Sequence, residues 1–157
     1  MIVEHSFVTT MDESNALRVA ESFLFELGFS LDERVTRGIT TRRGRDRPSA
    51  SHAISQLPQN VRVEFDRGRV TIGASIREIG KATDLHKDLM LAIVSGLESI
   101  LVQRQMPEQA RQPVDEVEQQ IGQEHAKRRR RQIGCFIALG IFLVALVVLI
   151  TVAVVNS

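Results

Sequence analysis

The clearest pattern in the chain is an alternation of apolar and polar side chains over residues 60–76, interrupted once at Arg67-Gly68. Alternation with a period of two places the two kinds of side chain on opposite faces of a strand. The apolar positions are Val61, Val63, Phe65, Val70, Ile72, Ala74 and Ile76. The pattern predicts two antiparallel strands joined by a tight turn, with one face on a hydrophobic core and the other polar.

Three other stretches have the composition of strands but a less regular alternation. Residues 2–10, IVEHSFVTT, predict a first strand, and residues 30–43, SLDERVTRGITTRR, predict a second one. Residues 50–56, between Pro48 and Pro58, predict a further short strand. Together with the hairpin they predict a small antiparallel sheet.

Two stretches repeat apolar residues at the spacing of a helix instead. The first follows Thr10, which has the spacing of a capping box with Glu13, and it ends at Gly28. Its apolar positions are Ala16, Leu17, Ala20, Phe23, Leu24 and Leu27. The second covers residues 83–105, and its apolar positions are Leu85, Leu89, Ala92, Ile93, Gly96, Leu97, Ile100 and Leu101. Each pattern predicts an amphipathic helix with one apolar side.

The expected element order is therefore β-α-β-(β)-β-β-α, an α+β fold. Two helices on one face of an antiparallel sheet bury both apolar stripes in a small two-layer domain. This order resembles that of small ligand-binding or interaction domains, such as one repeat of the TATA-binding-protein fold. The resemblance is one of element order alone, and it implies no function.

The longest apolar run is Ile133–Val155, twenty-three residues within a stretch from 132 to 157 that carries no formal charge. A helix of that length is roughly 34 Å long, enough to cross a hydrocarbon core of about 30 Å. The run is apolar all round, so a small domain could hardly bury every side of it. The sequence predicts a C-terminal transmembrane helix.

Five cations directly precede this run: Lys127, Arg128, Arg129, Arg130 and Arg131. Basic residues next to a span stay in the cytoplasm, so the expected topology is single-pass and tail-anchored, with the N-terminal domain cytoplasmic. The segment MIVEHSFVTT at residues 1–10 has no features of a signal peptide. The same cations are candidates for contact with anionic lipid. A nuclear-localisation or nucleic-acid motif is the alternative, and the adjoining span favours topology.

The predicted organisation has three parts: an α+β domain at residues 1–106, a juxtamembrane connector at 107–131, first acidic and then basic, and the anchor at 132–157. Pro107 and Pro113 are expected to break the second helix. After them Val114, Val117 and Ile121 form a thin apolar stripe. The stripe allows a paired helix, and the acidic composition equally allows a solvated connector.

Charge and composition restrict the chemistry. Residues 1–106 hold fourteen basic and fourteen acidic side chains, and a neutral domain argues against nucleic-acid binding. The four histidines have no metal-ligand spacing with other ligands, and no phosphate-binding glycine motif occurs. The single cysteine, Cys135, lies in the predicted span, where a small apolar filler is favoured over a palmitoylation site. We therefore expect no catalytic residue, cofactor or metal, and these patterns favour a non-catalytic protein over an enzyme.

One stretch is rich in arginine: Arg34, Arg37, Arg42, Arg43, Arg45 and Arg47 lie within fourteen residues. Guanidinium groups bind phosphates and carboxylates through paired hydrogen bonds. Arg42, Arg43, Arg45 and Arg47 are therefore candidate contacts for anions or anionic lipid. The alternative is a solvated strand face and loop.

Three functions are compatible with these patterns. The first is a membrane-tethered, non-catalytic binding or adaptor module with an unidentified protein partner. The second is a carrier or enzyme that holds a small or lipid-like ligand in a cavity between sheet and helices. The third is a structural homo-oligomer of the membrane, for which Gly134 and Ala138 have the spacing of close-packed helices.

Overall fold

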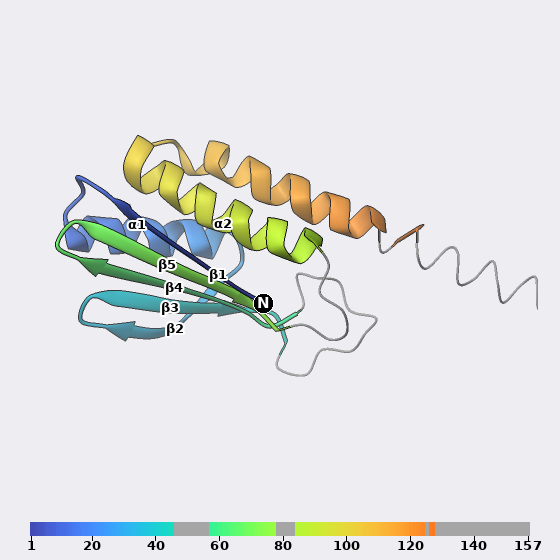
Figure 1. Ribbon diagram of the computed structural model, residues 1–157, viewed down its shortest axis with the longest axis horizontal. Coiled ribbons are helices and arrows are strands. Elements are labelled where there is room, and N and C mark those ends of the chain that lie inside the picture. The colour runs from blue at the N-terminus through green and yellow to red at the C-terminus, as the bar shows by residue number, and fades with distance from the viewer. Residues whose placement is uncertain (46–56, 78–83, 125, 128–157) are drawn as a thin grey trace, which may run out of the picture. The chain divides into compact units, whose positions relative to one another are not determined.

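Five antiparallel strands form one sheet in the order β1-β5-β4-β3-β2, with three helices beside it (Figure 1). The computed structural model describes residues 1–45, 57–77, 84–124, 126 and 127. The strands are β1 (Ile2–Val8), β2 (Ser30–Val35), β3 (Gly38–Arg43), β4 (Gln59–Asp66) and β5 (Arg69–Ile76). The α+β prediction with an antiparallel sheet is confirmed.

The predicted hairpin of residues 60–76 is confirmed as β4 and β5. Its register pairs Val61 with Ala74 and Val63 with Ile72, so the apolar sets of both strands share one face and are buried. Arg67 and Gly68 have φ values of 50° and 83°. Positive φ at both central residues is the geometry of a two-residue turn that matches the right-handed twist of the strands.

The prediction of a single strand over residues 30–43 is wrong, because the chain reverses after Val35. Strands β2 and β3 pair with each other, with Val35 opposite Gly38 and Ser30 opposite Arg42. Only Thr36 and Arg37 separate them, and neither residue is a typical marker of a tight turn. All six residues of β2 are exposed, so no buried face marked this strand in the sequence. The short strand predicted at 50–56 lies outside the described residues.

Helix α1 (Glu13–Glu26) begins one residue after Asp12, so the predicted capping box from Thr10 is wrong. The Oδ1 atom of Asp12 accepts a hydrogen bond from the backbone N–H of Asn15 at 3.0 Å, which is the normal bond of an N-cap side chain. The predicted end at Gly28 is confirmed. There Gly28 N donates to Phe25 O and Phe29 N donates to Leu24 O, the paired bonds of a Schellman motif.

Helix α2 (Asp84–Gln103) lies on the same face of the sheet as α1, so the opposite face is left without a helix among the described residues. The core between the layers contains Phe23, Ile72, Leu89, Ile93 and Leu97 with no exposed surface. The Cβ of an alanine at position 96 would lie 2.8 Å from both Ala110 O and Phe23 Cζ. The three helices therefore approach one another closely at this glycine.

The third helix covers residues 107–124, so the predicted break at Pro113 is wrong. Pro107 stands at the first helical position, where a missing N–H costs nothing. Ala110, Val114 and Ile121 of this helix are buried in the core. The first compact unit accordingly extends from Met1 to Ile121, beyond the boundary predicted at residue 106, and Gly122–Ser157 forms a second unit.

None of the helices among the described residues is both long and apolar enough to cross a membrane. The predicted span at residues 133–155 lies outside the described residues.

Candidate functional site

The arginine stretch divides into one buried and several exposed side chains. The side chain of Arg43 is only 7 % exposed, whereas that of Arg42 is 56 % exposed. Arg42 Nε lies 3.2 Å from Asp32 Oδ1 on the neighbouring strand. Arg45 is exposed, and no ion pair involves it within the described part of the chain. Arg47 lies outside the described residues, so the structure places three of the four candidate anion contacts.

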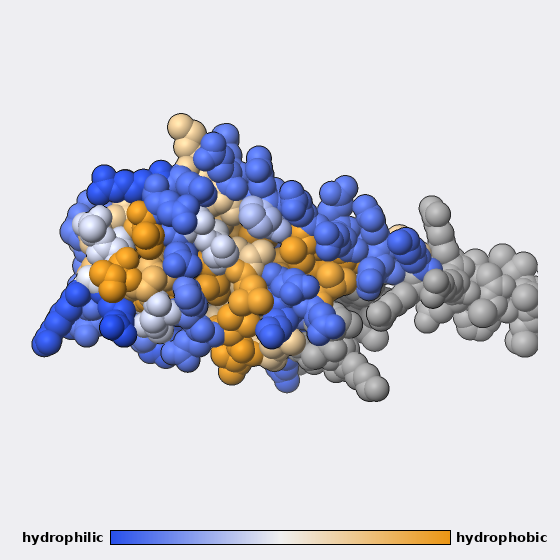
Figure 2. Space-filling view, turned by 45° about the horizontal axis from the view of Figure 1, so that its top comes forward, coloured by the Kyte–Doolittle hydropathy of each residue, from blue (hydrophilic) through white to orange (hydrophobic). Residues whose placement is uncertain are grey.

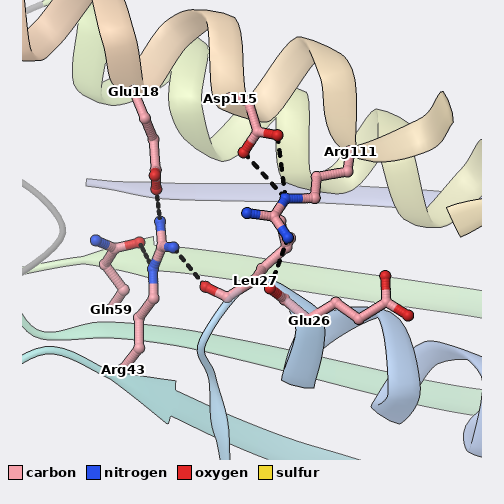
Figure 3. Close-up of polar contacts among 7 residues, drawn as sticks. All are labelled: Glu26, Leu27, Arg43, Gln59, Arg111, Asp115 and Glu118. Atoms are coloured by element: carbon pink, nitrogen blue, oxygen red, sulfur yellow. Dashed lines mark hydrogen bonds and ion pairs between the residues drawn. The ribbon is translucent and has the colours of Figure 1, made fainter. Parts of the chain in front are cut away.

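Arg43 uses its guanidinium group to join four parts of the fold (Figure 3). Its Nε donates to Gln59 Oε1 at 2.9 Å and its Nη1 donates to Leu27 O at 2.7 Å. Its Nη2 donates to Glu118 Oε1 at 2.5 Å, and the guanidinium carbon lies 4.7 Å from the centre of the Phe29 ring. One side chain of β3 thus contacts β4, the end of α1 and the helix of residues 107–124.

The electrostatics of this cluster are those of a buried ion pair. Burial lowers the pKa of Arg43, and the neighbouring Glu118 carboxylate opposes that shift. A buried charge must be paired and fully hydrogen-bonded, and here three donor nitrogens have acceptors. Arg43 therefore holds the fold together rather than presenting a free guanidinium to solvent.

A second arginine, Arg111, also joins the helix of residues 107–124 to the end of α1. Arg111 Nη1 donates to Glu26 O at 3.3 Å, and Arg111 Nε lies 3.1 Å from both carboxylate oxygens of Asp115 (Figure 3). The last turn of α1 contains no basic residue of its own. Arg43 and Arg111 supply the cations that a helix C-terminus favours, because its carbonyls lack partners and carry partial negative charge.

A surface hollow of about 490 Å³ lies where the start of α1 meets the turn after α2. Its lining combines the apolar residues Met11, Val19, Ile100 and Pro107 with the polar residues Thr10, Asp12, Asn15, Arg18, Arg104 and Gln105. Arg104 has a φ of 56°, a left-handed conformation that is uncommon for a residue with a side chain. Two guanidinium groups beside an apolar floor could hold an amphipathic anion.

Two local contacts oppose anion binding in this hollow. Arg18 Nη2 already donates to Asn15 Oδ1 at 3.1 Å. The hydrogen bonds from Asn15 hold the pKa of Asp12 below its usual range, so this carboxylate is negative at neutral pH. Arg104 forms no ion pair with any described residue, which leaves it as the guanidinium available to a ligand.

The described residues contain few of the side-chain groups that metal binding and acid–base catalysis require. No group of three or more metal-ligating side chains occurs there. His5 Nε2 lies 3.0 Å from Glu98 Oε2 at the exposed edge of the sheet. His52 and His125 lie outside the described residues. Of the five cations predicted next to the span, only Lys127 is described, and it is exposed.

No known protein family matches the chain, and no curated protein is significantly similar to it.

The structural role of Arg43 was missed at the level of sequence because all four arginines look alike in a charged stretch. The available signals were Phe29, which is apolar just beyond the glycine that ends α1, and the acidic residue Glu118 within the apolar stripe of the connector. Neither signal indicates which arginine the two residues contact, because that depends on how strand and helix pack.

Proposed function

We propose that the chain is a single-pass membrane protein whose N-terminal α+β domain is a non-catalytic binding module on the cytoplasmic side. The apolar run Ile133–Val155 and the five cations at 127–131 support the anchor and its orientation. The domain also has a complete sheet face that no helix covers among the described residues.

The observation that carries this proposal is the packing of the connector into the domain. Val114 has no exposed surface, and Ile121 is 3 % exposed. Eight residues, 125–132, then separate residue 124 of this helix from the apolar run. A segment of that length spans roughly 12 Å as a helix and at most about 29 Å when fully extended. Only a short segment therefore joins the domain to the proposed anchor.

The uncovered face of the sheet is the proposed binding surface. The sheet register places the alternate residues of four strands on this face, and most of them are polar or small. They include Glu4, Ser6, Thr40, Asn60, Arg62, Glu64, Thr71, Gly73 and Ser75. Small side chains on β5 let a partner approach the sheet closely, and the flanking charges of both signs suit a polar partner.

The hollow beside Arg18 and Arg104 favours a second candidate function, binding of a small amphipathic anion. Its volume of about 490 Å³ is in the range of small-molecule sites. This function would use a site between helices, and the cavity predicted between sheet and helices is not needed for it.

Two variants distinguish these functions in the full-length protein. Arg62→Glu reverses a charge on the uncovered face, and Arg104→Gln removes a charge from the hollow; both side chains are exposed, so the fold should persist. Proteins recovered with the tagged, detergent-solubilised chain should be lost with Arg62→Glu and retained with Arg104→Gln. Retention of these proteins with Arg62→Glu would contradict the proposed binding surface.

Topology is tested in the same cells. An N-terminal tag should resist protease added to intact cells and become sensitive after lysis. A tag that is digested on intact cells contradicts the proposed orientation.

A further inference from the structure

The two edges of the sheet differ in how they are protected against pairing with another strand. Edge strand β2 contains a bulge between Leu31 and Glu33 and carries Asp32, Glu33 and Arg34 in succession. Bulges and charged side chains are common devices that keep an edge from pairing. Edge strand β1 pairs with β5 over all seven residues without a bulge, and it contains neither proline nor lysine.

The open edge of β1 also exposes apolar side chains near both of its ends. Ile2 is 78 % exposed and Val8 is 67 % exposed. A long, regular edge strand with exposed apolar residues is an unusual feature of a soluble surface, because it offers unpaired backbone groups to any matching strand.

The hydrogen bonds to β5 identify the backbone groups that face outward. Ile76 N donates to Met1 O at 3.2 Å, and Thr9 N donates to Gly68 O at 2.9 Å. In an antiparallel pair alternate residues exchange both bonds with the neighbour, so the odd-numbered residues of β1 bond to β5. The N–H and C=O groups of Ile2, Glu4, Ser6 and Val8 consequently point to the open edge.

We propose that β1 pairs with β1 of a second copy of this chain, antiparallel and about a two-fold axis at His5, which joins the two sheets into one. In this register Ile2 lies opposite Val8 of the second copy, and Glu4 lies opposite Ser6. Both pairs unite residues of the uncovered face, and both use the outward backbone groups. Val3 and Phe7, which are partly buried, lie opposite each other on the helical face as pairs without backbone hydrogen bonds.

Neighbouring registers fit less well. An axis at Glu4 places two carboxylates opposite each other, which is destabilising. An axis at Ser6 places Glu4 opposite the apolar Val8 and leaves Ile2 without a partner. The axis at His5 pairs every exposed apolar residue of the strand with another apolar residue, and this self-complementarity selects a second copy as the occupant.

Helix α2 extends the apolar surface on the same side. Leu91 and Val102 are 43 % and 44 % exposed, and Glu98, which contacts His5, lies between them in sequence. Spacings of seven and four residues place these three on one side of the helix. On the face shown in Figure 2, hydrophobic residues lie among hydrophilic ones. A second copy at β1 would cover Ile2 and Val8, which are otherwise exposed.

Disulfide trapping in the full-length protein tests this pairing. In a background of Cys135→Ala, His5→Cys creates a single thiol on the proposed axis. Opposite residues of this non-hydrogen-bonded type have Cα atoms about 4.5 Å apart, which a disulfide can span. Mild oxidation of native membranes should convert most of the protein to a species of twice its mass. Glu33→Cys on the other edge should not cross-link.

A lysine on the edge provides the second test. Val8→Lys should reduce His5→Cys cross-linking at least tenfold, whereas Val35→Lys on β2 should leave it unchanged. No cross-link at His5, equal cross-linking at Glu33, or a dimer that survives Val8→Lys would each overturn the proposal. A cross-linked species of another mass would assign the edge to a different partner. Membrane fractionation of the same samples reports separately on the anchor, which this contact does not require.

Discussion

The packing of the connector helix into the domain can be tested at one residue, Val114. This side chain is completely buried, although it lies beyond the boundary at residue 106 that the sequence predicts. Replacing it with alanine removes two carbon atoms from the core. Their transfer to water accounts for about 1.6 kcal/mol, and the remaining cavity adds to this, so we expect Val114→Ala to cost about 2–3 kcal/mol.

The assay is thermal and denaturant unfolding of residues 1–124, the part of the chain that contains the first compact unit. For a domain of this size the unfolding entropy is about 0.26 kcal/mol per kelvin, so the Tm should fall by about 8–12 °C. Val102→Ala is the matched control, because Val102 is 44 % exposed on α2. That substitution should change stability by less than about 0.5 kcal/mol.

Truncation extends the same test. A chain of residues 1–106 loses Ala110, Val114, Ile121 and the partner of Arg43 together, so it should unfold at a lower temperature than residues 1–124 or without cooperativity. The reasoning is refuted if Val114→Ala and Val102→Ala unfold alike, or if the shorter chain is as stable as the longer one.

Four further predictions follow from the described contacts. Arg43→Gln should destabilise residues 1–124 by about 1–3 kcal/mol, because Leu27 O loses its side-chain donor and Glu118 loses its cationic partner. Arg42→Gln, at an exposed side chain, should have little effect in the same unfolding assay. Gly96→Ala should lower the Tm, since the new Cβ would meet Ala110 O at 2.8 Å, but Gly122→Ala, which meets nothing within 4 Å, should keep or raise helix stability. The pKa of Asp12 is lower in the folded state, so its carboxylate stabilises the fold above its unfolded pKa and this contribution is lost as the pH falls below about 4. Asp12→Asn can still cap α1 but does not titrate, so a curve of stability against pH should fall less steeply at acid pH for this variant. If Arg42, Arg45 and Arg47 bind anionic lipid, the triple variant Arg42→Gln, Arg45→Gln and Arg47→Gln should lose low-salt binding to anionic liposomes with an unchanged Tm. Equal binding by the variant and the unaltered protein would contradict lipid contact by these arginines.

Periodic patterns were sufficient wherever one face of an element is buried. The apolar residues of the β4–β5 hairpin alternate, and those of helices α1 and α2 repeat with the helical period, because the core requires apolar residues on one side only. Gly28 likewise marks the end of α1, since the left-handed conformation there, with a φ of 82°, is strained for any other residue.

Local patterns were insufficient where the deciding partner is distant in sequence. Strand β2 is exposed on both faces, so its separation from β3 leaves no trace in hydrophobicity, and only pairing with β3 defines it. Asp12 caps α1 instead of Thr10 because the backbone turns between the end of β1 at Val8 and the start of α1 at Glu13, and this turn decides which residue directly precedes the helix. The residue types alone therefore indicated neither the boundary between β2 and β3 nor the N-cap of α1.

The packing of the connector helix and the contacts of Arg43 also depend on partners that are distant in sequence. A thin stripe of Val114, Val117 and Ile121 suits either a solvated or a packed helix, and the choice depends on whether the core has a surface to receive it. Gly96 provides that surface by allowing the helices to approach. Arg43 is distinguished from the neighbouring arginines because the pleat of β3 turns it toward Leu27 and Glu118 and turns Arg42 toward solvent. The sequence determined which segments are amphipathic, and the tertiary structure decided which of their polar groups became internal contacts.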